Sequence, residues 1–143
     1  MKNTLTVLVL LSFILPLNLG CSSDDSTNPK DDIIQKLLGE WTLFSYEGGI
    51  AGLPETPTED DITISFDEDG NYKKFEDGQL TFEGTFEIDF FAANGQENIL
   101  LKTSDTNQWR LFFENERLSL DQNAINGADG FIFHYYKLEL VVF

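Results

Sequence analysis

Two Asp-Gly dipeptides lie close together in the middle of this chain, and short stretches of alternating apolar and polar residues flank them. The dipeptides are Asp69–Gly70 and Asp77–Gly78, and the stretches are residues 61–66, 71–75 and 79–87. Such a dipeptide between alternating stretches is the strongest short-range signal for a β-hairpin, because Asp and Gly tolerate the left-handed backbone of a tight turn. The sequence therefore predicts three consecutive antiparallel strands.

The rest of the chain repeats this pattern. Further alternating stretches are joined mostly by short turns, such as those at Asn94–Gly95 and Glu114–Asn115. We expect these further strands at 39–46, 97–103, 107–113, 117–121 and from Phe131 to about Val142. A chain of about eight hairpin-linked strands removes its unpaired edges by closing. The fold class predicted is therefore an all-β, eight-stranded, antiparallel up-and-down barrel, whose interior holds side chains or one small ligand.

A short helix is predicted before the first strand. Asn28 and Pro29 supply an N-cap and a first helical residue, and Gly39 permits the left-handed ending of a helix. The apolar residues of the segment share one face at helical spacing: Ile33, Ile34, Leu37 and Leu38. Because about two turns of helix are not stable alone, this helix is expected to pack against the sheet.

Two features suggest where a barrel of this kind bends and opens. Gly84 lies on the inward-facing side of its strand, which indicates a bend or a close approach. Residues 48–60 form a connection rich in Gly and Pro that is long for a compact domain, and such loops are commonly lids, binding loops or mobile segments. If the barrel holds a cavity, its mouth is expected at the end that carries this connection.

The first 20 residues are interpreted as a secretory signal rather than as part of the domain. Lys2 precedes an apolar run from Leu5 to Leu15, and Pro16 follows it. The run is shorter than the roughly 20 residues that a membrane-spanning helix needs. Three segments are therefore expected: a leader at 1–20, a polar tether at 21–30 and a barrel domain at 31–143.

The only cysteine follows the leader directly. Residues 18–21, Asn-Leu-Gly-Cys, resemble the lipobox of bacterial lipoproteins, which implies cleavage before Cys21 and acylation of Cys21 with fatty acids such as palmitate. The alternative is an ordinary leader cut near Gly20 that leaves a free thiol. Residues 22–25, Ser-Ser-Asp-Asp, resemble the acidic tether of surface-exported lipoproteins. The resemblance implies a lipid anchor in the outer membrane, with the domain on the periplasmic side or at the cell surface.

The charge balance excludes several classes of partner. The chain has 9 Lys and Arg against 25 Asp and Glu, and loss of Lys2 with the leader takes its net charge from −16 to −17. Nucleic-acid binding requires the opposite sign, and so does a polybasic membrane contact. The acidic residues are interspersed, which is typical of a solvated surface. We expect a single, monomeric domain held at the membrane by its acyl chains.

Gly39-Glu-Trp41, after a short helix and at the start of the first strand, resembles the Gly-x-Trp signature of the lipocalin and calycin barrels. The resemblance includes the long first connection and the phrase Phe66-Asp-Glu-Asp-Gly-Asn-Tyr72, and it covers residues 31–140. It implies a barrel that binds a small apolar or amphipathic ligand. It also implies that a basic residue of the last strand packs over the tryptophan, a role that falls to Lys137.

The aromatic residues expected to face the interior, together with the only histidine, form the candidate ligand-binding set: Trp41, Phe66, Phe82, Phe86, Trp109, Phe113, His134 and Tyr136. Sequence alone does not distinguish a cavity from a filled core. With a filled core, the protein is expected to be an interaction module that contacts another envelope protein or a glycan through its long loops or through Thr42, Phe44 and Tyr46.

No enzymatic activity, metal or cofactor is predicted. A single histidine does not make a His-rich metal site, and no nucleophile lies beside a base. Glu83 and Glu87 lie on the outward face of their strand, where solvation explains them. Residues 65–76 place oxygen-bearing side chains at the spacing of a calcium loop, but their flanks alternate as strands do, whereas that motif needs helices. A plain hairpin is expected there.

Overall fold

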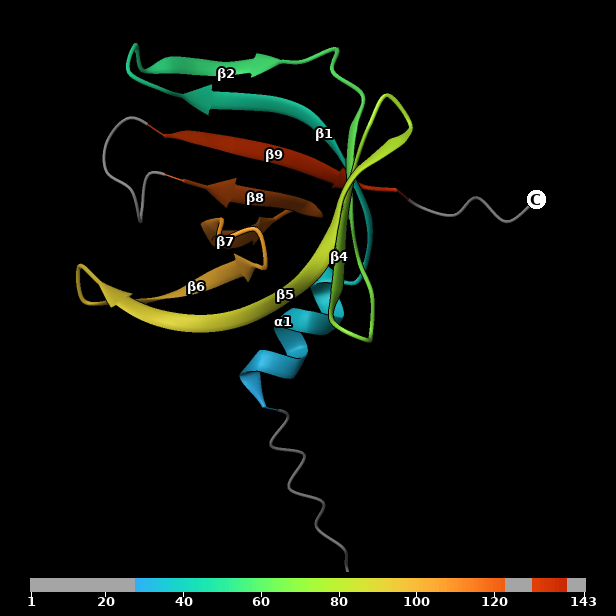
Figure 1. Cartoon of the computed structure of the whole chain (residues 1–143). Helices are drawn as coiled ribbons and strands as arrows, with labels where there is room; N and C mark the ends of the chain where they lie inside the picture. The colour runs from blue at the N-terminus through green and yellow to red at the C-terminus, as the bar shows by residue number, and fades with distance from the viewer. Residues whose placement is uncertain (1–27, 123–129, 139–143) are drawn as a thin grey trace, which may run out of the picture.

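The computed structural model describes residues 28–122 and 130–138 (Figure 1). The expected leader and Cys21 lie outside the described residues, and so does the end of the last predicted strand beyond Leu138. The described part contains one helix, α1 (Pro29–Leu37), and the strands β1 (Gly39–Gly48), β2 (Leu53–Pro57), β3 (Ile62–Phe66), β4 (Asn71–Glu76), β5 (Gln79–Ala93), β6 (Gln96–Thr103), β7 (Gln108–Glu114), β8 (Arg117–Asp121) and β9 (Phe131–Lys137).

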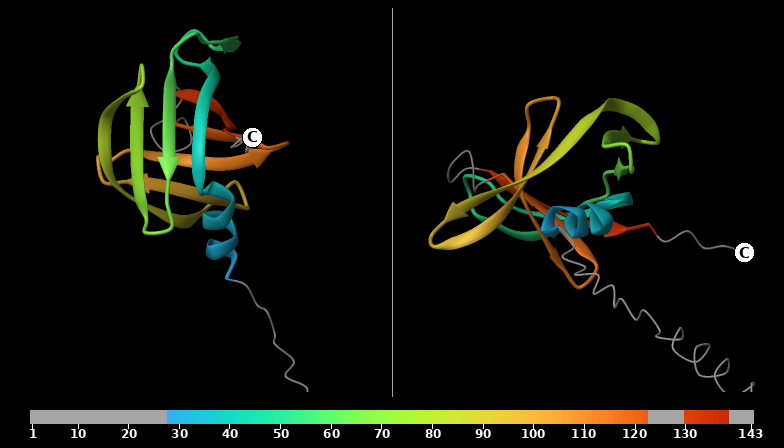
Figure 2. Two further views of the ribbon diagram at one scale, coloured as in Figure 1. Left: turned by 90° about the vertical axis from the view of Figure 1, so that its right-hand side faces the viewer. Right: turned by 90° about the horizontal axis from the view of Figure 1, so that it is seen from below.

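Eight of the strands form a closed antiparallel barrel, which confirms the predicted fold class. Strands β1 and β3 to β9 pair in sequence order, and β9 returns to pair with β1. Figure 2 shows the sheet curving round, with α1 at one end. Because every neighbouring pair is antiparallel, the connections alternate between two ends. One end, here called the helix end, carries α1 and the β3–β4, β5–β6 and β7–β8 turns; the other, the open end, carries the β1–β3, β4–β5, β6–β7 and β8–β9 connections.

The tight turns have the backbone that their sequences predict. Both residues of the Asp77–Gly78 turn have positive φ, 52° and 70°, and Asn94–Gly95 is similar at 53° and 74°. The turn between β3 and β4 spans residues 67–70, and the Asp67 carboxylate accepts hydrogen bonds from the backbone N–H of Asp69 and from the backbone and side chain of Asn71. This carboxylate therefore stabilises the hairpin.

The helix begins and ends where capping predicts. Asn28 Oδ1 accepts from the backbone N–H of Lys30, Pro29 is the first helical residue, and Gly39 follows the helix with φ of 112°. Leu37 is fully buried in the core beneath the helix, and Ile33 and Ile34 pack against that core. In the described residues, no helix has the length and apolar character needed to cross a membrane.

The long connection after β1 is more ordered than the sequence suggests. Its second half forms β2, which pairs antiparallel with the end of β1, from Ser45 opposite Pro57 to Gly48 opposite Leu53. In Figure 1 this hairpin projects beyond the barrel instead of folding across it. This strand was not predicted from the sequence; backbone pairing with β1 and a hydrogen bond between Ser45 and Glu55 hold it in the sheet.

A β-bulge in β1 changes which side chains face inward. Leu43 lies opposite Tyr135, but Ser45 lies opposite His134, so Phe44 is the extra residue. The inward set therefore changes from the odd-numbered residues of β1 before the bulge to the even-numbered ones after it. Ser45 and His134 consequently share the outer face of the barrel.

The core lies inside the barrel and is largely filled. Its buried members are Leu37, Trp41, Leu43, Ile64, Phe66, Tyr72, Phe86, Ile88, Leu101, Trp109, Leu111, Leu118, Leu120 and Tyr135. Gly84 lets the walls approach, because a Cβ there would lie 2.0 Å from Ser104 Oγ and 2.9 Å from the Phe82 ring. The sequence prediction of a close approach at Gly84 is confirmed.

Candidate functional site

A cavity of about 210 Å³ lies in the barrel interior towards the open end. Its apolar wall comes from five elements of the sheet: Leu43, Ile62, Trp109, Leu120 and Phe133. Its polar groups are Tyr72, Lys74, Asp105, Asn107, Gln122 and Tyr135. Asp105 and Asn107 belong to the β6–β7 connection, which places the rim at the end that carries the β1–β3 connection. This is the end at which the sequence predicts a mouth.

Two phenol hydroxyls have no hydrogen-bond partner among the described residues. Tyr72 on β4 is 5% exposed and Tyr135 on β9 is 6% exposed, and both line the cavity. Among the described residues, two side-chain nitrogen or oxygen atoms are both out of reach of water and without a hydrogen bond, namely Arg110 Nε and Arg117 Nε. The phenol oxygens of Tyr72 and Tyr135 are not among them. The two side chains are therefore buried and line the cavity, while their hydroxyl oxygens remain accessible to water.

Both phenols stay protonated. Burial, and then the nearby Asp105 carboxylate, raises the pKa of Tyr72 above its usual value. Burial, and then Tyr72 itself, raises the pKa of Tyr135 in the same direction. The ring of Tyr72 is fixed by its neighbours, with ring centres 5.3 Å from Phe66 and 5.8 Å from Phe82. Two protonated phenols therefore line the cavity, and ring contacts hold one of them, Tyr72.

The charged groups at the rim are already paired. Lys74 Nζ lies 2.6 Å from Glu76 Oε1. The Asp105 carboxylate accepts from the Thr103 hydroxyl and from the backbone and side-chain N–H groups of Asn107, the latter at 2.7 Å. Lys74 therefore has an ion-pair partner, whereas the Asp105 carboxylate accepts hydrogen bonds from neutral groups of the rim itself.

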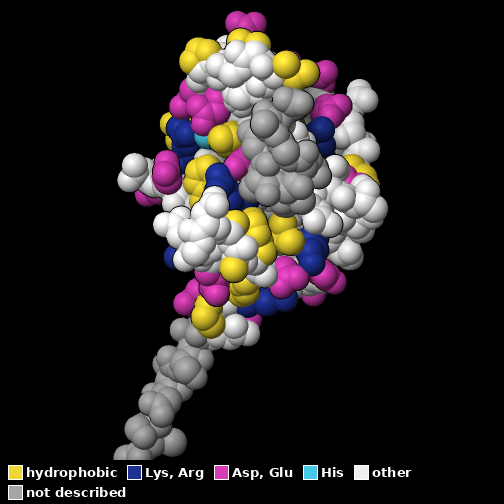
Figure 3. Space-filling view, turned by 90° about the vertical axis from the view of Figure 1, so that its left-hand side faces the viewer, with side chains coloured by type: hydrophobic (Ala, Val, Ile, Leu, Met, Phe, Trp, Pro, Cys, Tyr) yellow, Lys and Arg dark blue, Asp and Glu magenta, His cyan; other side chains and the backbone are white. Residues whose placement is uncertain are grey.

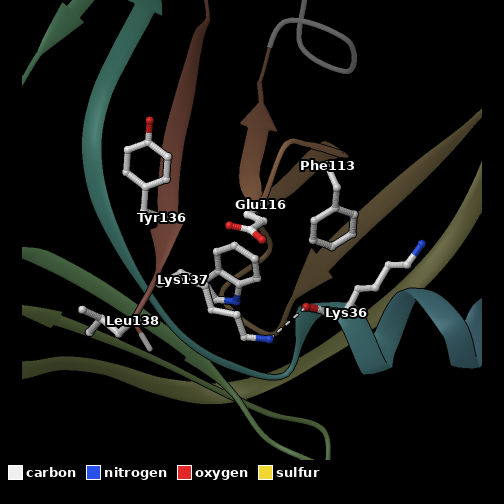
Figure 4. A pocket seen from close by; sticks show the side chains of 7 residues that line it. Lys36, Phe113, Glu116, Tyr136, Lys137 and Leu138 are labelled. Carbon is white, nitrogen blue, oxygen red and sulfur yellow. Dashed lines mark hydrogen bonds between the residues drawn. The ribbon is translucent and has the colours of Figure 1, made fainter. Parts of the chain in front are cut away.

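A larger and more open groove of about 740 Å³ lies at the helix end. Seven residues line it: Lys36, Trp41, Phe113, Glu116, Tyr136, Lys137 and Leu138. Figure 4 labels all of them except Trp41. Most of them are surface side chains, with Tyr136 at 51% and Leu138 at 49% exposure. Trp41, at 2% exposure, contributes little open surface. The groove is therefore a surface feature at the helix end of the barrel.

The outer face of β8, β9 and β1 carries a buried polar cluster. Ser119 Oγ lies 2.9 Å from His134 Nδ1, and Arg117 Nη2 lies 3.3 Å from His134 Nε2. Arg117 Nη1 also donates to Glu55 at 3.2 Å, and Ser45 Oγ donates to the same carboxylate at 2.7 Å. Because the Arg117 guanidinium only donates, Nε2 accepts and the imidazole proton lies on Nδ1. The cluster ties β2 to the barrel wall.

Burial and the charge of Arg117 favour the neutral form of His134. Burial, followed by the positive charge of Arg117, lowers the pKa of His134, while the Glu55 and Glu47 carboxylates act in the opposite direction. The hydrogen bond from Ser45, with Arg117 also contributing, lowers the pKa of Glu55.

Figure 3 shows acidic, basic and hydrophobic side chains interspersed over one face of the molecule, without a broad area of one sign.

The structure does not bring the eight predicted ligand-binding residues together. Trp109 alone of the set lines the interior cavity. The others fall into three places: Phe66, Phe82 and Phe86 pack in or against the core, Trp41, Phe113 and Tyr136 line the helix-end groove, and His134 lies in the outer polar cluster. The bulge in β1 and the presence of aromatic residues on both faces of β9 made this division unpredictable from the sequence.

The surface proposed for protein contacts is also divided. Phe44 stacks on Tyr136, with ring centres 3.9 Å apart, and Arg117 lies over its ring. Tyr46 lies opposite Phe133 past the bulge and contacts Phe131 edge-on. Thr42, Phe44 and Tyr46 are each half-buried. They therefore do not present one continuous exposed face.

Sequence reasoning missed Tyr72 and Tyr135. Tyr72 could have been identified, because pairing across the 67–70 turn puts it opposite the inward-facing Phe66. Tyr135 has no such signal, since apolar residues occupy both faces of β9. Within the described ranges, no group of three or more His, Cys, Asp and Glu side chains is placed to hold a metal ion.

The contact implied for Lys137 is present in the structure, with Nζ 5.3 Å from the centre of the Trp41 ring. No protein-family model matches the chain, and no curated protein matches its sequence. An eight-stranded antiparallel barrel, compatible with a lipocalin-like fold, is what the geometry shows.

Proposed function

We propose that this protein is a non-enzymatic, lipocalin-like binding protein that holds a small amphipathic molecule in the interior cavity at its open end. The observation that carries the proposal is the pair of buried tyrosines, Tyr72 and Tyr135, whose hydroxyls have no hydrogen-bond partner among the described residues and which stand beside an apolar wall. A few placed polar groups in an otherwise apolar pocket are the usual form of a small-molecule site.

The cavity sets the size of the ligand. Its volume of about 210 Å³ is below the range of roughly 300–1,000 Å³ typical of drug-sized ligands. It exceeds the engineered cavity of about 150 Å³ that takes up benzene. A ligand about the size of one substituted ring fits, whereas a long acyl chain does not.

The proposal includes a membrane anchor. Cleavage before Cys21 and acylation of its thiol, with palmitate among the acyl groups, would hold a monomeric domain at the outer membrane, on the periplasmic side or at the cell surface. The lipobox-like residues 18–21 and the acidic residues that follow support this location. The net charge of −16 supports a role without nucleic acid.

A second candidate function is an interaction module that contacts another envelope protein or a glycan. The observation in its favour is the tip of the β1–β2 hairpin, where Ile50 is 88% exposed and Leu53 is 44% exposed. Figure 1 shows this hairpin projecting from the barrel. The two functions use different parts of the molecule and can be tested separately.

Native mass spectrometry of the full protein, purified in mild detergent from its source, tests the binding function. We expect a non-covalent mass excess that disappears on denaturation. Leu120→Phe, which fills the cavity, should remove the excess, and Leu138→Phe in the helix-end groove should retain it. An absence of any excess, or its survival in Leu120→Phe, would contradict the proposed site.

A further inference from the structure

We propose that the ligand is an uncharged carbonyl compound, such as a single-ring ketone, lactone, ester or amide, whose oxygen accepts hydrogen bonds from Tyr72 and Tyr135. This inference rests on the proposed binding function and adds the chemical class of the ligand. It follows from the position of the two phenols, their protonation and the charges around them.

The two hydroxyls belong to different walls of one cavity. Tyr72 lies on β4 and Tyr135 on β9, and these strands are not neighbours in the sheet. Both residues are more than nine-tenths buried and line the same space. They are also close enough that Tyr72 contributes to raising the pKa of Tyr135. A ligand between the walls therefore has one phenol donor on each side of the cavity.

The phenols call for an acceptor. Each keeps its proton at physiological pH, because burial raises both pKa values. A hydrocarbon that displaced water from the cavity would leave these donors without a partner, at a cost of roughly 1–3 kcal/mol, so an occupant that offers an acceptor is favoured. A carbonyl oxygen has two lone pairs and accepts from two donors at once.

The surrounding charges oppose an ionised ligand. The positive charge of Lys74 is paired with Glu76, and Lys74 is the only basic residue in the described lining of the cavity. The Asp105 carboxylate, which raises the pKa of Tyr72, would also repel a ligand carboxylate. Burial of a ligand ammonium carries a desolvation cost, and the ammonium would have to share the oxygens of Asp105 with Thr103 and Asn107. An uncharged group avoids both costs.

The apolar wall accommodates the remainder of such a ligand. Leu43, Leu120 and Phe133 contribute aliphatic and aromatic surface, and the Trp109 ring lines the same space. Aromatic side chains favour offset or edge-on contacts with another ring. A ring that carries a carbonyl substituent can therefore contact the apolar wall through its ring and the two phenols through its carbonyl oxygen.

Isothermal titration of the full-length protein, stripped of bound ligand and held in detergent micelles, with three matched probes tests the inference. The probes are acetophenone, benzoate and ethylbenzene, which share a ring and differ in charge and in the oxygen acceptor. We expect acetophenone to bind about tenfold more tightly than either of the others. Tyr72→Phe and Tyr135→Phe should each weaken acetophenone binding by about 2- to 10-fold, since a hydrogen bond is worth about 0.5–1.5 kcal/mol.

Tyr136→Phe is the matched control, because this phenol lies on the outer face, 3.9 Å from the Phe44 ring centre. It should bind acetophenone as the wild type does. Infrared spectra of carbonyl-labelled acetophenone need no variant: a carbonyl band lowered in frequency on binding is expected from two donors. A band at the position seen in hydrocarbon solvent would contradict the inference.

The outcomes separate the ligand class from the binding function. Equal or tighter binding of benzoate would overturn the uncharged class, and equal binding of ethylbenzene would overturn the carbonyl acceptor, while the proposed function would stand in both cases. Unchanged affinity in both Tyr→Phe variants would also reject the inference alone. Failure of all three probes to bind would contradict the proposed function as well.

Discussion

Lys137 lies across the indole ring of Trp41, with its Nζ 5.3 Å from the ring centre, and this contact joins the last strand of the barrel to the first. Both residues also bond to the end of α1: Trp41 Nε1 donates to the Leu37 carbonyl at 2.7 Å, and Lys137 Nζ donates to that of Lys36 at 3.4 Å. Carbonyls at a helix C-terminus lack partners within the helix. The pair therefore closes the barrel and fixes the helix with the same side chains.

Replacing Lys137 with Met should lower the free energy of unfolding by about 0.5–1 kcal/mol, because a cation over an aromatic ring at an exposed site is worth about that amount. Urea denaturation measures the change. Lys137→Arg retains the cation and should stay close to the wild type. Equal stability of Lys137→Met and the wild type would show that the contact contributes nothing.

Acid should weaken the outer polar cluster through His134. Since its folded pKa is lowered, the unfolded chain takes up the proton first as pH falls below about 6.5. The contribution of His134 is therefore complete above that pH and is lost as pH falls. Protonation puts an N–H on Nε2, where Arg117 already donates and where the Glu47 and Glu55 carboxylates compensate only in part.

Unfolding free energies at pH 7.5 and pH 5.5 test this pH dependence. The wild type should lose stability between them, and His134→Gln, which does not titrate, should lose less. The pKa of Glu55 is lowered, so this carboxylate remains ionised across the interval. The same pH slope in His134→Gln and the wild type would assign the effect to other groups.

Gly84→Ala should destabilise the protein by about 1–3 kcal/mol, the usual cost of overpacking. The added methyl would meet Ser104 Oγ at 2.0 Å, an oxygen that also accepts from the Thr85 backbone N–H. Ser104→Ala should recover part of the loss in the double variant, which a thermodynamic cycle from denaturant unfolding measures. Strict additivity of the two changes would argue against this contact.

Cys21→Ala should abolish acylation. Cells grown with labelled palmitate should label the wild-type protein and leave the variant at background, and the variant should leave the detergent phase in a partition assay. Ser22→Ala, beside the proposed acceptor, should label normally. Label retained on Cys21→Ala would rule out the thiol as the attachment site.

The hairpins and the helix were predictable because their signals are local. Asp77–Gly78 and Asn94–Gly95 encode the positive φ angles that a two-residue turn requires. Asn28 and Pro29 start the helix by their own chemistry, and Gly39 permits its end. Closure of the barrel followed from counting strands. The hairpin and helix predictions depend on no contact between distant segments, whereas closure joins the first strand to the last.

The site was predictable only in part, because its geometry depends on register. Because of the bulge at Phe44, Ser45 lies on the outer face of the barrel beside His134. No residue type at this point of β1 predicts that the strand has one residue more than its partner. Two prolines, Pro54 and Pro57, argued against a strand, yet β2 forms at the edge of the sheet, where proline is tolerated. Most of the aromatic residues predicted to bind a ligand therefore pack elsewhere, in the core or at the helix end, and do not line the interior cavity.

The two tryptophans report on the two candidate sites separately, because Trp109 lines the interior cavity and Trp41 lines the helix-end groove. A titration of ligand-stripped protein with benzene, followed by the two indole N–H signals in ¹H–¹⁵N spectra, tests the interior site most directly. We expect a saturable shift of the Trp109 signal and an unchanged Trp41 signal. A shift of Trp41 alone, or of neither signal, would contradict a ligand site in the interior of the barrel.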